Sequence, residues 1–282
     1  MKIGLVLSGG MAKGAYQIGA LRAINKFIPK DEITCISCAS VGVLNGYAYV
    51  TDQLDVAEKM WKGLCNNGSR FLITQMLKSS LLQQDILELY NPEKTLDNTF
   101  YCSLMDLHNR NVVYKDLSGV EQKKIPRYLR ACVAMPIYNR AVPLDGTEYY
   151  DGAIIDNIPI YPLMKHDLDY IICMYFDDVC YKFESAKLDK KVIKITFPSD
   201  TLLRQSVLFE QDSIDAMIKK GYDRTYHLLK NVFYEGYDNT ACIYKTIDYM
   251  NRTASPNLRI TGDVLCTNLN KVAQRLAKRK IL

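Results

Sequence analysis

Strand-like and helix-like segments alternate along this chain of 282 residues. Apolar runs rich in β-branched and aromatic residues are found near 2–8, 33–37, 99–107, 110–115, 169–176 and 191–196. Helical periodicity is found near 14–28, 41–50, 53–65, 71–90, 209–234, 238–251 and 266–279. This alternation is typical of a mostly parallel sheet with helices on both faces, so we predict an α/β fold. Sites in such folds lie at the carboxyl ends of the strands.

The first predicted strand ends in a glycine-rich turn, Gly9-Gly10-Met11-Ala12-Lys13-Gly14, and an amphipathic helix follows from about Ala15. Such a turn exposes backbone N–H groups at a helix start, where the helix dipole favours negative charge. It therefore suits a phosphate or the oxyanion of an acyl-transfer intermediate. A P-loop would need a lysine after its last glycine and then a hydroxyl residue, which this turn lacks. Its glycine spacing also differs from the dinucleotide-binding fingerprint G-x-G-x-x-G.

A second turn between a strand and a helix follows about 25 residues later, at Cys38-Ala39-Ser40-Val41-Gly42. This is the G-x-S-x-G nucleophile elbow with Cys38 in place of the first glycine. In an elbow the serine lies on a strained turn with its Oγ exposed and its own N–H at a helix start. A degenerate elbow alone is a weak signal, but together with the glycine turn it favours Ser40 as a nucleophile.

A serine nucleophile needs a base within hydrogen-bond reach. Asp151 lies in Tyr149-Tyr150-Asp151-Gly152-Ala153, and its apolar neighbours would raise its pKa toward the working pH. The alternative is that this Asp-Gly pair only forms a turn and has no role in catalysis. The sequence has three histidines, and all lie in patterns typical of structural or solvated residues: His108, His166 and His227. The order Ser40, Asp151, His227 also fits an α/β-hydrolase triad, so this alternative stays open.

Together these motifs resemble the patatin-like phospholipase family. The resemblance rests on Gly-Gly-x-x-Lys-Gly, on the serine elbow, and on Asp-Gly-Ala with Asn157 and Pro159 behind it. It is specific over residues 2–50 and about 127–163. The resemblance implies a three-layer fold with a mostly parallel central sheet. It also implies hydrolysis of lipid acyl esters by a Ser–Asp dyad without histidine, metal or cofactor.

By this resemblance, Ser40 is the nucleophile and Asp151 is the base. The amides around Gly9, Gly10 and Met11 would form the oxyanion hole. The resemblance also implies that Ser40 is first acylated and that the alcohol or lysolipid leaves. A water activated by Asp151 then hydrolyses the acyl-enzyme. Four further residues belong to the same motifs: Lys13, Gly14, Gly42 and Gly152. The segment 131–136, Ala-Cys-Val-Ala-Met-Pro, resembles a family segment beside the active site.

The chain departs from the family pattern at two positions. Met11 replaces a third glycine, and Cys38 replaces the first glycine of the elbow. If Met11 requires a positive φ, the non-glycine residue costs roughly 1–2 kcal/mol, and its side chain crowds the substrate carbonyl. Neither change removes a reacting group. They nevertheless keep open a second function class, a catalytically impaired relative that binds lipid and acts as a regulatory module.

The net charge and the cysteine content indicate which binding partners and which cellular compartment to expect. A net charge of +5 spread along the chain is too small to indicate nucleic-acid binding. Nine cysteines include one formal C-x-x-C, Cys35 and Cys38, but no second pair, so we predict neither a zinc site nor a disulfide framework. We expect a cytoplasmic protein, since no signal peptide is apparent and runs such as 168–176 are too short to cross a bilayer.

We expect a catalytic core over residues 1–200, with a helical cap around 53–90, and a helical extension over 201–282 packed on this core. Residues 69–90 have a wide apolar face, which suits either a core helix or a cap over an acyl channel. Residues 271–282 form a basic amphipathic pattern. This end is either a solvated helix or one that rests on anionic lipid at roughly 1 kcal/mol per basic residue, which would make the protein peripheral to the membrane.

Overall fold

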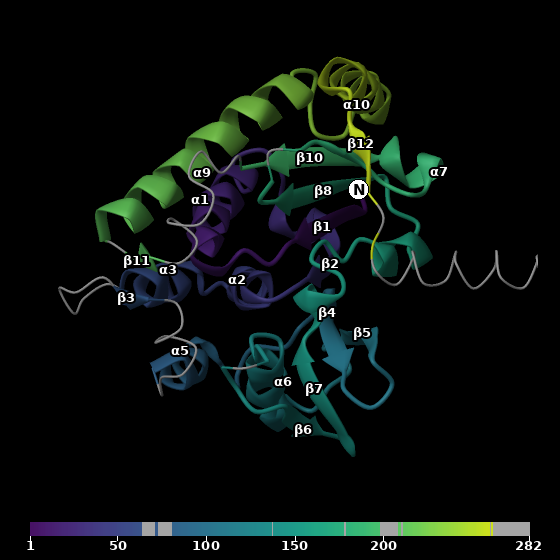
Figure 1. Cartoon of the computed structure of the whole chain (residues 1–282). Helices are drawn as coiled ribbons and strands as arrows, with labels where there is room; N and C mark the ends of the chain where they lie inside the picture. Colours follow the sequence, from purple (N-terminus) through teal and green to yellow (C-terminus); the bar gives the residue numbers. More distant parts are fainter. Residues whose placement is uncertain are drawn as a thin grey trace, which may run out of the picture.

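The computed structural model describes residues 1–63, 71–72, 81–136, 138–177, 179–197, 208–209, 211–259 and 261. Its main element is an eight-stranded sheet with helices around it (Figure 1). Five strands are parallel, in the order β10 (Val192–Thr196), β8 (Tyr170–Tyr175), β1 (Ile3–Leu7), β2 (Ile33–Cys38) and β4 (Thr99–Asp106). Antiparallel strands complete it: β5 (Asn111–Asp116), β7 (Thr147–Asp151) and β6 (Val142–Leu144). The predicted α/β class is confirmed.

The central strands are apolar because helical or looped layers cover both faces of the sheet. Along β1 the side chains alternate between two cores. Leu5 and Leu7 join the larger core, to which α1 (Gly14–Ile24) and α2 (Val41–Val50) contribute. Val6 joins a second core, under the 3₁₀-helix η5 (Tyr161–Lys165) and α7 (Ala186–Asp189). The result is a three-layer arrangement.

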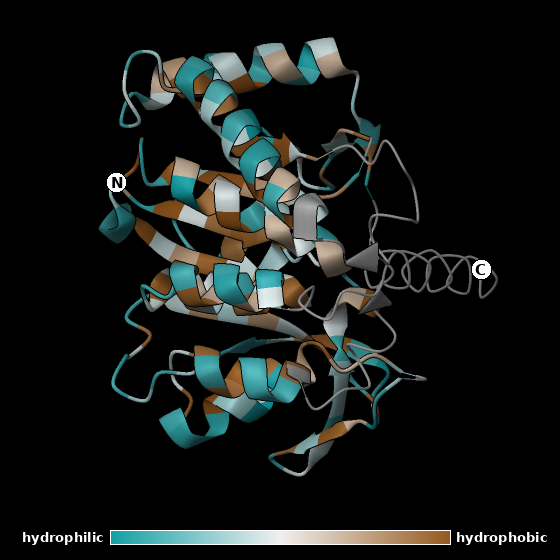
Figure 2. Ribbon diagram, turned by 90° about the vertical axis from the view of Figure 1, so that its left-hand side faces the viewer, coloured by the Kyte–Doolittle hydropathy of each residue, from teal (hydrophilic) through white to brown (hydrophobic). Residues whose placement is uncertain are grey.

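The remaining helices surround this framework. They are α3 (Leu54–Gly63), α5 (Leu81–Leu89), α6 (Ile125–Ala131), α9 (Gln211–Val232) and α10 (Thr240–Ala254). Hydrophilic and hydrophobic residues alternate in bands along the surface helices, as expected for elements with one buried stripe (Figure 2). Among the residues that the structure describes, none of the helices combines the length and the apolar character that crossing a bilayer requires.

Most predicted elements lie within a few residues of the observed ones, and the predicted helix 71–90 is the main correction. Phe71–Leu72 form a short strand, β3, that pairs in antiparallel fashion with β11 (Leu208–Phe209). The helix in this region is α5, over Leu81–Leu89. Residues 73–80 and the predicted helix 266–279 lie outside the described residues. A second short pair joins β9 (Tyr181–Lys182) to β12 (Asn257–Leu258).

The long helix α9 lies directly on α1, and two glycines make this close contact possible (Figure 1). A Cβ atom at Gly19 would lie 1.9 Å from the carbonyl oxygen of Ile218. A Cβ atom at Gly221 would lie 2.0 Å from the carbonyl oxygen of Tyr16. Backbone therefore packs against backbone at this crossing, and neither position accepts a larger residue without movement of a helix.

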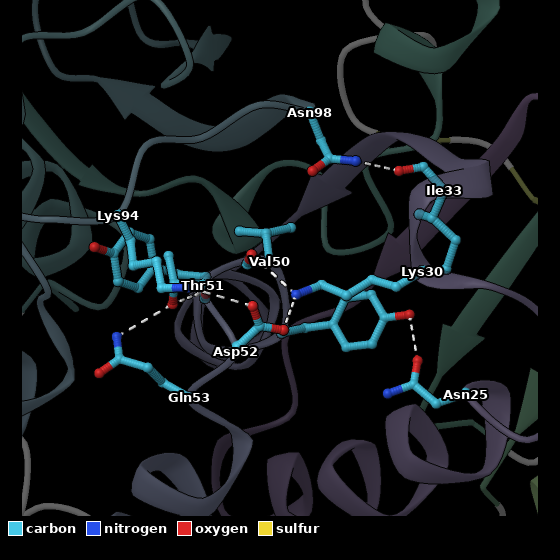
Figure 3. A network of polar contacts seen from close by, with 11 residues as sticks. Asn25, Lys30, Ile33, Val50, Thr51, Asp52, Gln53, Lys94 and Asn98 are labelled. Atoms are coloured by element: carbon cyan, nitrogen blue, oxygen red, sulfur yellow. Dashed lines mark hydrogen bonds and ion pairs between the residues drawn. The ribbon is translucent and has the colours of Figure 1, made fainter.

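A polar network anchors the carboxyl end of α2, close to the start of β2 (Figure 3). Lys30 donates to the carbonyl of Val50 over 3.1 Å and forms an ion pair with Asp52. Asn98 donates to the carbonyl of Ile33, the first residue of β2. The Lys30 contacts fix α2 at the end of the helix opposite to Ser40, and the Asn98 contact holds the start of β2.

Candidate active site

Strand register brings the three predicted motifs together. Leu7 of β1 is paired with Cys38 of β2, so the turns that follow these two strands start side by side. Cys38 is in turn paired with Cys102 of β4. Two residues further along β4, Leu104 is paired with Asp151 of β7. Strands β2 and β7 therefore pair with the same edge of β4, β2 as far as Cys102 and β7 from Leu104 onward. As a result, the end of β7 lies next to the elbow that follows β2.

Ser40 lies between β2 and α2 in a strained conformation, with φ +52° and ψ −133°. Such a backbone costs of order 1–3 kcal/mol, and it persists because the surrounding structure fixes it. Gly42 is required two residues later, since a Cβ atom there would lie 2.5 Å from the carbonyl oxygen of Leu7. The local geometry is that of a nucleophile elbow, with a serine that is 9% exposed.

Asp151 is completely buried at the end of β7. Its Oδ1 accepts a hydrogen bond of 2.9 Å from the amide of Ala153. Its Oδ2 is buried and accepts no hydrogen bond of ordinary geometry from the described residues, but the Ser40 hydroxyl is near enough to influence the pKa of this carboxyl. Burial raises the pKa of Asp151 to about 7, although hydrogen bonding from Ser40 and Ala153 acts in the opposite direction. A carboxyl with this pKa can accept a proton near neutral pH.

The segment 131–136 lies beside this carboxylate. The carbonyl of Ala134 accepts a hydrogen bond of 2.8 Å from the backbone amide of Asp151. Val133 and Met135 line the same cavity as Ser40 and Asp151. The segment therefore holds the main chain of the candidate base and forms part of the wall around it.

The glycine turn faces Ser40 from the neighbouring strand. A Cβ atom at Gly9 would lie 2.7 Å from the Cβ of Ser40, so this position needs glycine. Met11 has φ +52°, the positive φ considered from the sequence. Within the described part of the chain, no carbonyl or side chain accepts a hydrogen bond from the amides of Gly10 and Met11. The third amide expected in the oxyanion hole, that of Gly9, already donates to the carbonyl of Asn157 over 3.3 Å. The amides of Gly10 and Met11 are therefore the candidate donors.

These residues enclose a cavity of about 250 Å³ with an apolar wall. Its lining joins the glycine turn, the elbow, the end of β7, helix α5 and the loop that contains Asn157: Gly9, Gly10, Met11, Ser40, Val41, Leu82, Val133, Met135, Asp151, Ala153, Ile154 and Asn157. Val133 and Met135 come from the segment 131–136, which the family resemblance places beside the active site. Leu82 lies in the wide apolar pattern at 69–90 that was considered as a cap.

The other predicted motif residues lie behind this cavity. Lys13 ends the 3₁₀-helix η1 (Met11–Lys13), and its amide donates to the carbonyl of Gly10 over 3.0 Å. Gly14 begins α1 against the ring of Trp61, and Gly152 lies against the main chain of β4 at Ser103. Each of these two glycines allows a close approach of neighbouring elements.

The histidines lie elsewhere, and none lines the cavity within the described part of the chain. The His166 ring is hydrogen-bonded to the hydroxyl of Tyr101 over 3.1 Å. His108 follows β4 in a turn that Asp106 caps. His227 lies on α9, with its ring edge-on to the neighbouring Tyr226.

Comparison with known proteins agrees with this geometry. The family model described as patatin-like phospholipase matches residues 5–164, more than half of the chain. The chain belongs to the patatin-like phospholipase family. This match covers the glycine turn after β1, the elbow and the end of β7, and so includes the three motifs quoted from the sequence.

Relatives and solved structures of this family can be named. The lysophospholipase NTE1 of Cryptococcus neoformans is 28% identical over 180 residues, which is 61% of this chain, in both strain JEC21 and strain B-3501A. The match spans only 11% of the length of these relatives. Two solved structures are similar at low identity. VipD from Legionella pneumophila is 14% identical with a TM-score of 0.48, covering 82% of this chain and 67% of VipD. The type III effector ExoU is 13% identical with a TM-score of 0.41, covering 98% of this chain and 64% of ExoU.

Proposed function

We propose that this patatin-like protein is a serine acyl hydrolase that cleaves fatty acyl esters of membrane lipids or lysolipids. The observation that carries the proposal is the meeting of Ser40 with a buried carboxyl, Asp151, whose pKa is raised to about 7. A serine is a weak nucleophile until a base takes its proton, and Asp151 is the group that can do so.

In the first half of the proposed reaction, Asp151 accepts the hydroxyl proton while Ser40 Oγ attacks the ester carbonyl. The negative charge that develops on the carbonyl oxygen is stabilised by the amides of Gly10 and Met11, which have no other acceptor among the described residues. Asp151 then protonates the leaving alcohol or lysolipid. In the second half, Asp151 takes a proton from water and the water attacks acyl-Ser40. Asp151 then returns the proton to Ser40 Oγ as the fatty acid leaves.

The cavity supports an acyl substrate, because its wall is mostly apolar and its polar side chains are those of Ser40, Asp151 and Asn157. The similarity to a lysophospholipase supports a lipid ester rather than another carboxylic ester. We further propose a core over residues 1–200 with a cap around 53–90, to which Leu82 would contribute, and a C-terminal extension packed on it through α9. A cytoplasmic protein that contacts the membrane surface remains our proposal for its location.

One observation favours a second candidate function, a lipid-binding relative with impaired catalysis. The side chain of Met11 lines the cavity at a backbone position with φ +52°, where the family pattern has glycine. In that case the cavity would still hold an acyl chain, but the substrate carbonyl would not reach the amides of the turn.

Labelling and turnover separate the two candidates. We expect a fluorophosphonate probe to modify Ser40, as located by peptide mapping, and the protein to release fatty acid from mixed phospholipid vesicles. Both signals should disappear in Ser40→Ala, and turnover should disappear in Asp151→Asn. A folded protein without labelling or turnover, on vesicles and on a short-chain ester, would instead support the lipid-binding candidate.

A further inference from the structure

A chain of buried amide groups runs behind the glycine turn and connects three helices. It starts at Trp61 of α3, continues through Asn45 of α2 and Gln17 of α1, and ends at the carbonyl of Ser8. The three hydrogen bonds measure 2.9, 2.8 and 2.8 Å. The Asn45 and Gln17 side chains and Ser8 are completely buried, and Trp61 is 1% exposed.

The donors of this chain can point in only one direction. The indole N–H of Trp61 is a donor without acceptor capacity, so the Asn45 atom that it meets must be the carbonyl oxygen Oδ1. The amide nitrogen of Asn45 then donates to Gln17 Oε1, which leaves Gln17 Nε2 as donor to the carbonyl of Ser8. Since buried polar groups without partners are costly, reversal of any single amide is strongly disfavoured.

The same chain holds both ends of the turn that contains Gly10 and Met11. Gln17 holds the carbonyl of Ser8 before the turn, and Asn45 Nδ2 donates over 2.9 Å to the carbonyl of Gly14 after it. Asn45 lies on α2, the helix whose amino-terminal end follows Ser40. One buried side chain therefore links the nucleophile helix to the oxyanion turn.

We propose that Gln17 and Asn45 are positioning residues of the active site, which fix the amides of Gly10 and Met11 relative to Ser40. This inference rests on the proposed hydrolase function, in which those amides stabilise the oxyanion. The planar peptide unit that contains the Ser8 carbonyl carries the amide of Gly9, so Gln17 fixes the first of the three peptide units that lead to the amide of Met11. The turn needs such rigid support because the φ of Met11 is unfavourable for a residue other than glycine. The hydrogen-bonded side chains of Gln17 and Asn45 supply it.

The direct test replaces the amide by an apolar side chain of similar length. Gln17→Met keeps a long unbranched side chain in α1 but leaves the Ser8 carbonyl without its donor. We expect kcat/KM on a p-nitrophenyl ester to fall roughly 10- to 100-fold, less than the 10²–10³-fold that loss of an oxyanion donor costs. Asn45→Asp, which retains an acceptor for Trp61 but loses the NH₂ donor, should show a loss of at least the same size.

Two ligands distinguish positioning from a general loss of structure. A trifluoromethyl ketone forms a tetrahedral adduct with the serine and places an oxyanion in the hole, whereas a fatty alcohol of the same chain length carries no negative oxygen. In Gln17→Met the affinity for the ketone should fall in proportion to kcat/KM, and the affinity for the alcohol should stay within about twofold. Equal losses for both ligands, or no loss of kcat/KM, would overturn the proposal.

Tyr49→Phe provides a matched control on the same two helices. The hydroxyl of Tyr49, near the carboxyl end of α2, donates over 2.7 Å to Asn25 at the end of α1. This variant also removes one hydrogen bond between α1 and α2, here a partly buried one. We expect it to lower the melting temperature about as much as Gln17→Met does, with kcat/KM unchanged.

A crystal structure of Gln17→Met makes the test independent of turnover. We expect the peptide units between Ser8 and Met11 to rotate or to occupy more than one orientation. If these peptides keep their orientation, Gln17 does not position the turn. If they rotate but wild-type protein neither hydrolyses esters nor binds the ketone, the positioning is real and the proposed hydrolase function is wrong.

Discussion

Met11 and Ser40 both have φ +52°, and both line the cavity. Neither residue is glycine, so each holds a conformation that costs of order 1–3 kcal/mol. At Ser40 this strain accompanies the exposed Oγ of an elbow. At Met11 the strain serves no such purpose, because a glycine at this position would present the same backbone N–H to the oxyanion without the steric cost of a positive φ.

Replacement of Met11 tests whether its side chain restricts the reaction. We expect Met11→Gly to raise kcat/KM on a bulky acyl ester several-fold, because it removes both the positive-φ strain and the side chain at the cavity wall. Its free energy of unfolding should remain within about 1 kcal/mol of wild type, since the relief of strain is offset by the greater freedom of glycine in the unfolded chain. Met11→Ala is the control that removes the side chain but keeps the strain. An unchanged rate in both variants would show that Met11 does not crowd the substrate.

The raised pKa of Asp151 predicts the pH dependence of catalysis. The base must be ionised in order to accept the proton of Ser40, and its pKa is about 7. We therefore expect kcat/KM to rise with pH through about 7 and to level off above it. A pH–rate profile on a soluble short-chain ester measures this directly. A rate that is flat from pH 5 to pH 8 would contradict the assignment of Asp151 as base.

The same pKa predicts that Asp151 destabilises the fold at high pH. Its pKa is higher in the folded chain (about 7) than the ordinary value of 3.8, so the folded state retains a proton that the unfolded state releases. Stability should fall as the pH rises from about 4 to 7 and then level off. We expect Asp151→Asn to be more stable than wild type at pH 8, by up to about 4 kcal/mol, and equally stable near pH 4. Denaturant unfolding at both pH values provides the measurement, and an equal difference at both would contradict the linkage.

At the scale of elements, the contact between α1 and α9 depends on backbone meeting backbone at Gly19 and Gly221. We expect Gly221→Ala to destabilise the protein by about 1–3 kcal/mol, because the added methyl group would lie 2.0 Å from the carbonyl oxygen of Tyr16. Gly63→Ala in α3 is the matched control, since no atom of the described residues lies within 4 Å of a Cβ atom there. That variant should be neutral or more stable by up to about 1 kcal/mol. Similar unfolding curves for the two variants would show that the helices adjust freely.

At the scale of the whole molecule, a buried ion pair joins distant parts of the chain around the loop after Asp151. Asp156 is completely buried, receives a hydrogen bond of 2.6 Å from the Tyr114 hydroxyl of β5, and forms an ion pair with Arg259, just after β12. Arg259 is 8% exposed. The last described strand thus helps to hold the loop that leads from Asp151 to Asn157.

We expect Arg259→Met to destabilise the fold by about 3–5 kcal/mol, because it leaves the Asp156 carboxyl buried without its partner. The double variant Arg259→Met with Asp156→Asn should recover a large part of this loss, since it removes the completely buried charge of Asp156 and leaves only Glu184, 3.8 Å from Arg259, without its ion-pair partner. Thermal unfolding of the two variants and wild type measures the recovery. An Arg259→Met protein as stable as wild type would show that Asp156 is held by Tyr114 and the main chain alone.

Regular elements were predictable where the local pattern agrees with the tertiary contacts. Helix 41–50 was predicted with the bounds of α2, and the strands near 33–37 and 169–176 correspond to β2 and β8. The error at 71–90 has a physical cause. Phe71–Leu72 pair with Leu208–Phe209, and a partner so distant in the sequence leaves no trace in the local periodicity.

For the candidate site, the motifs identified Ser40 and Asp151, but not Gln17 or Asn45. Their signal was a polar residue within an apolar helix, which sequence alone cannot distinguish from an exposed position.

The sequence by itself determined the α/β class, the two turns that follow β1 and β2, and the family, because strand periodicity, glycine turns and elbow motifs are local properties. Only the tertiary structure decided which groups meet. The register of β4 with both β2 and β7 brings Asp151 to Ser40, and the folding of the chain around Asp151 excludes the water that would keep its pKa low. Strand order, close backbone contact and desolvation all depend on residues far apart in the chain, and these properties turn a serine and an aspartate into a candidate dyad.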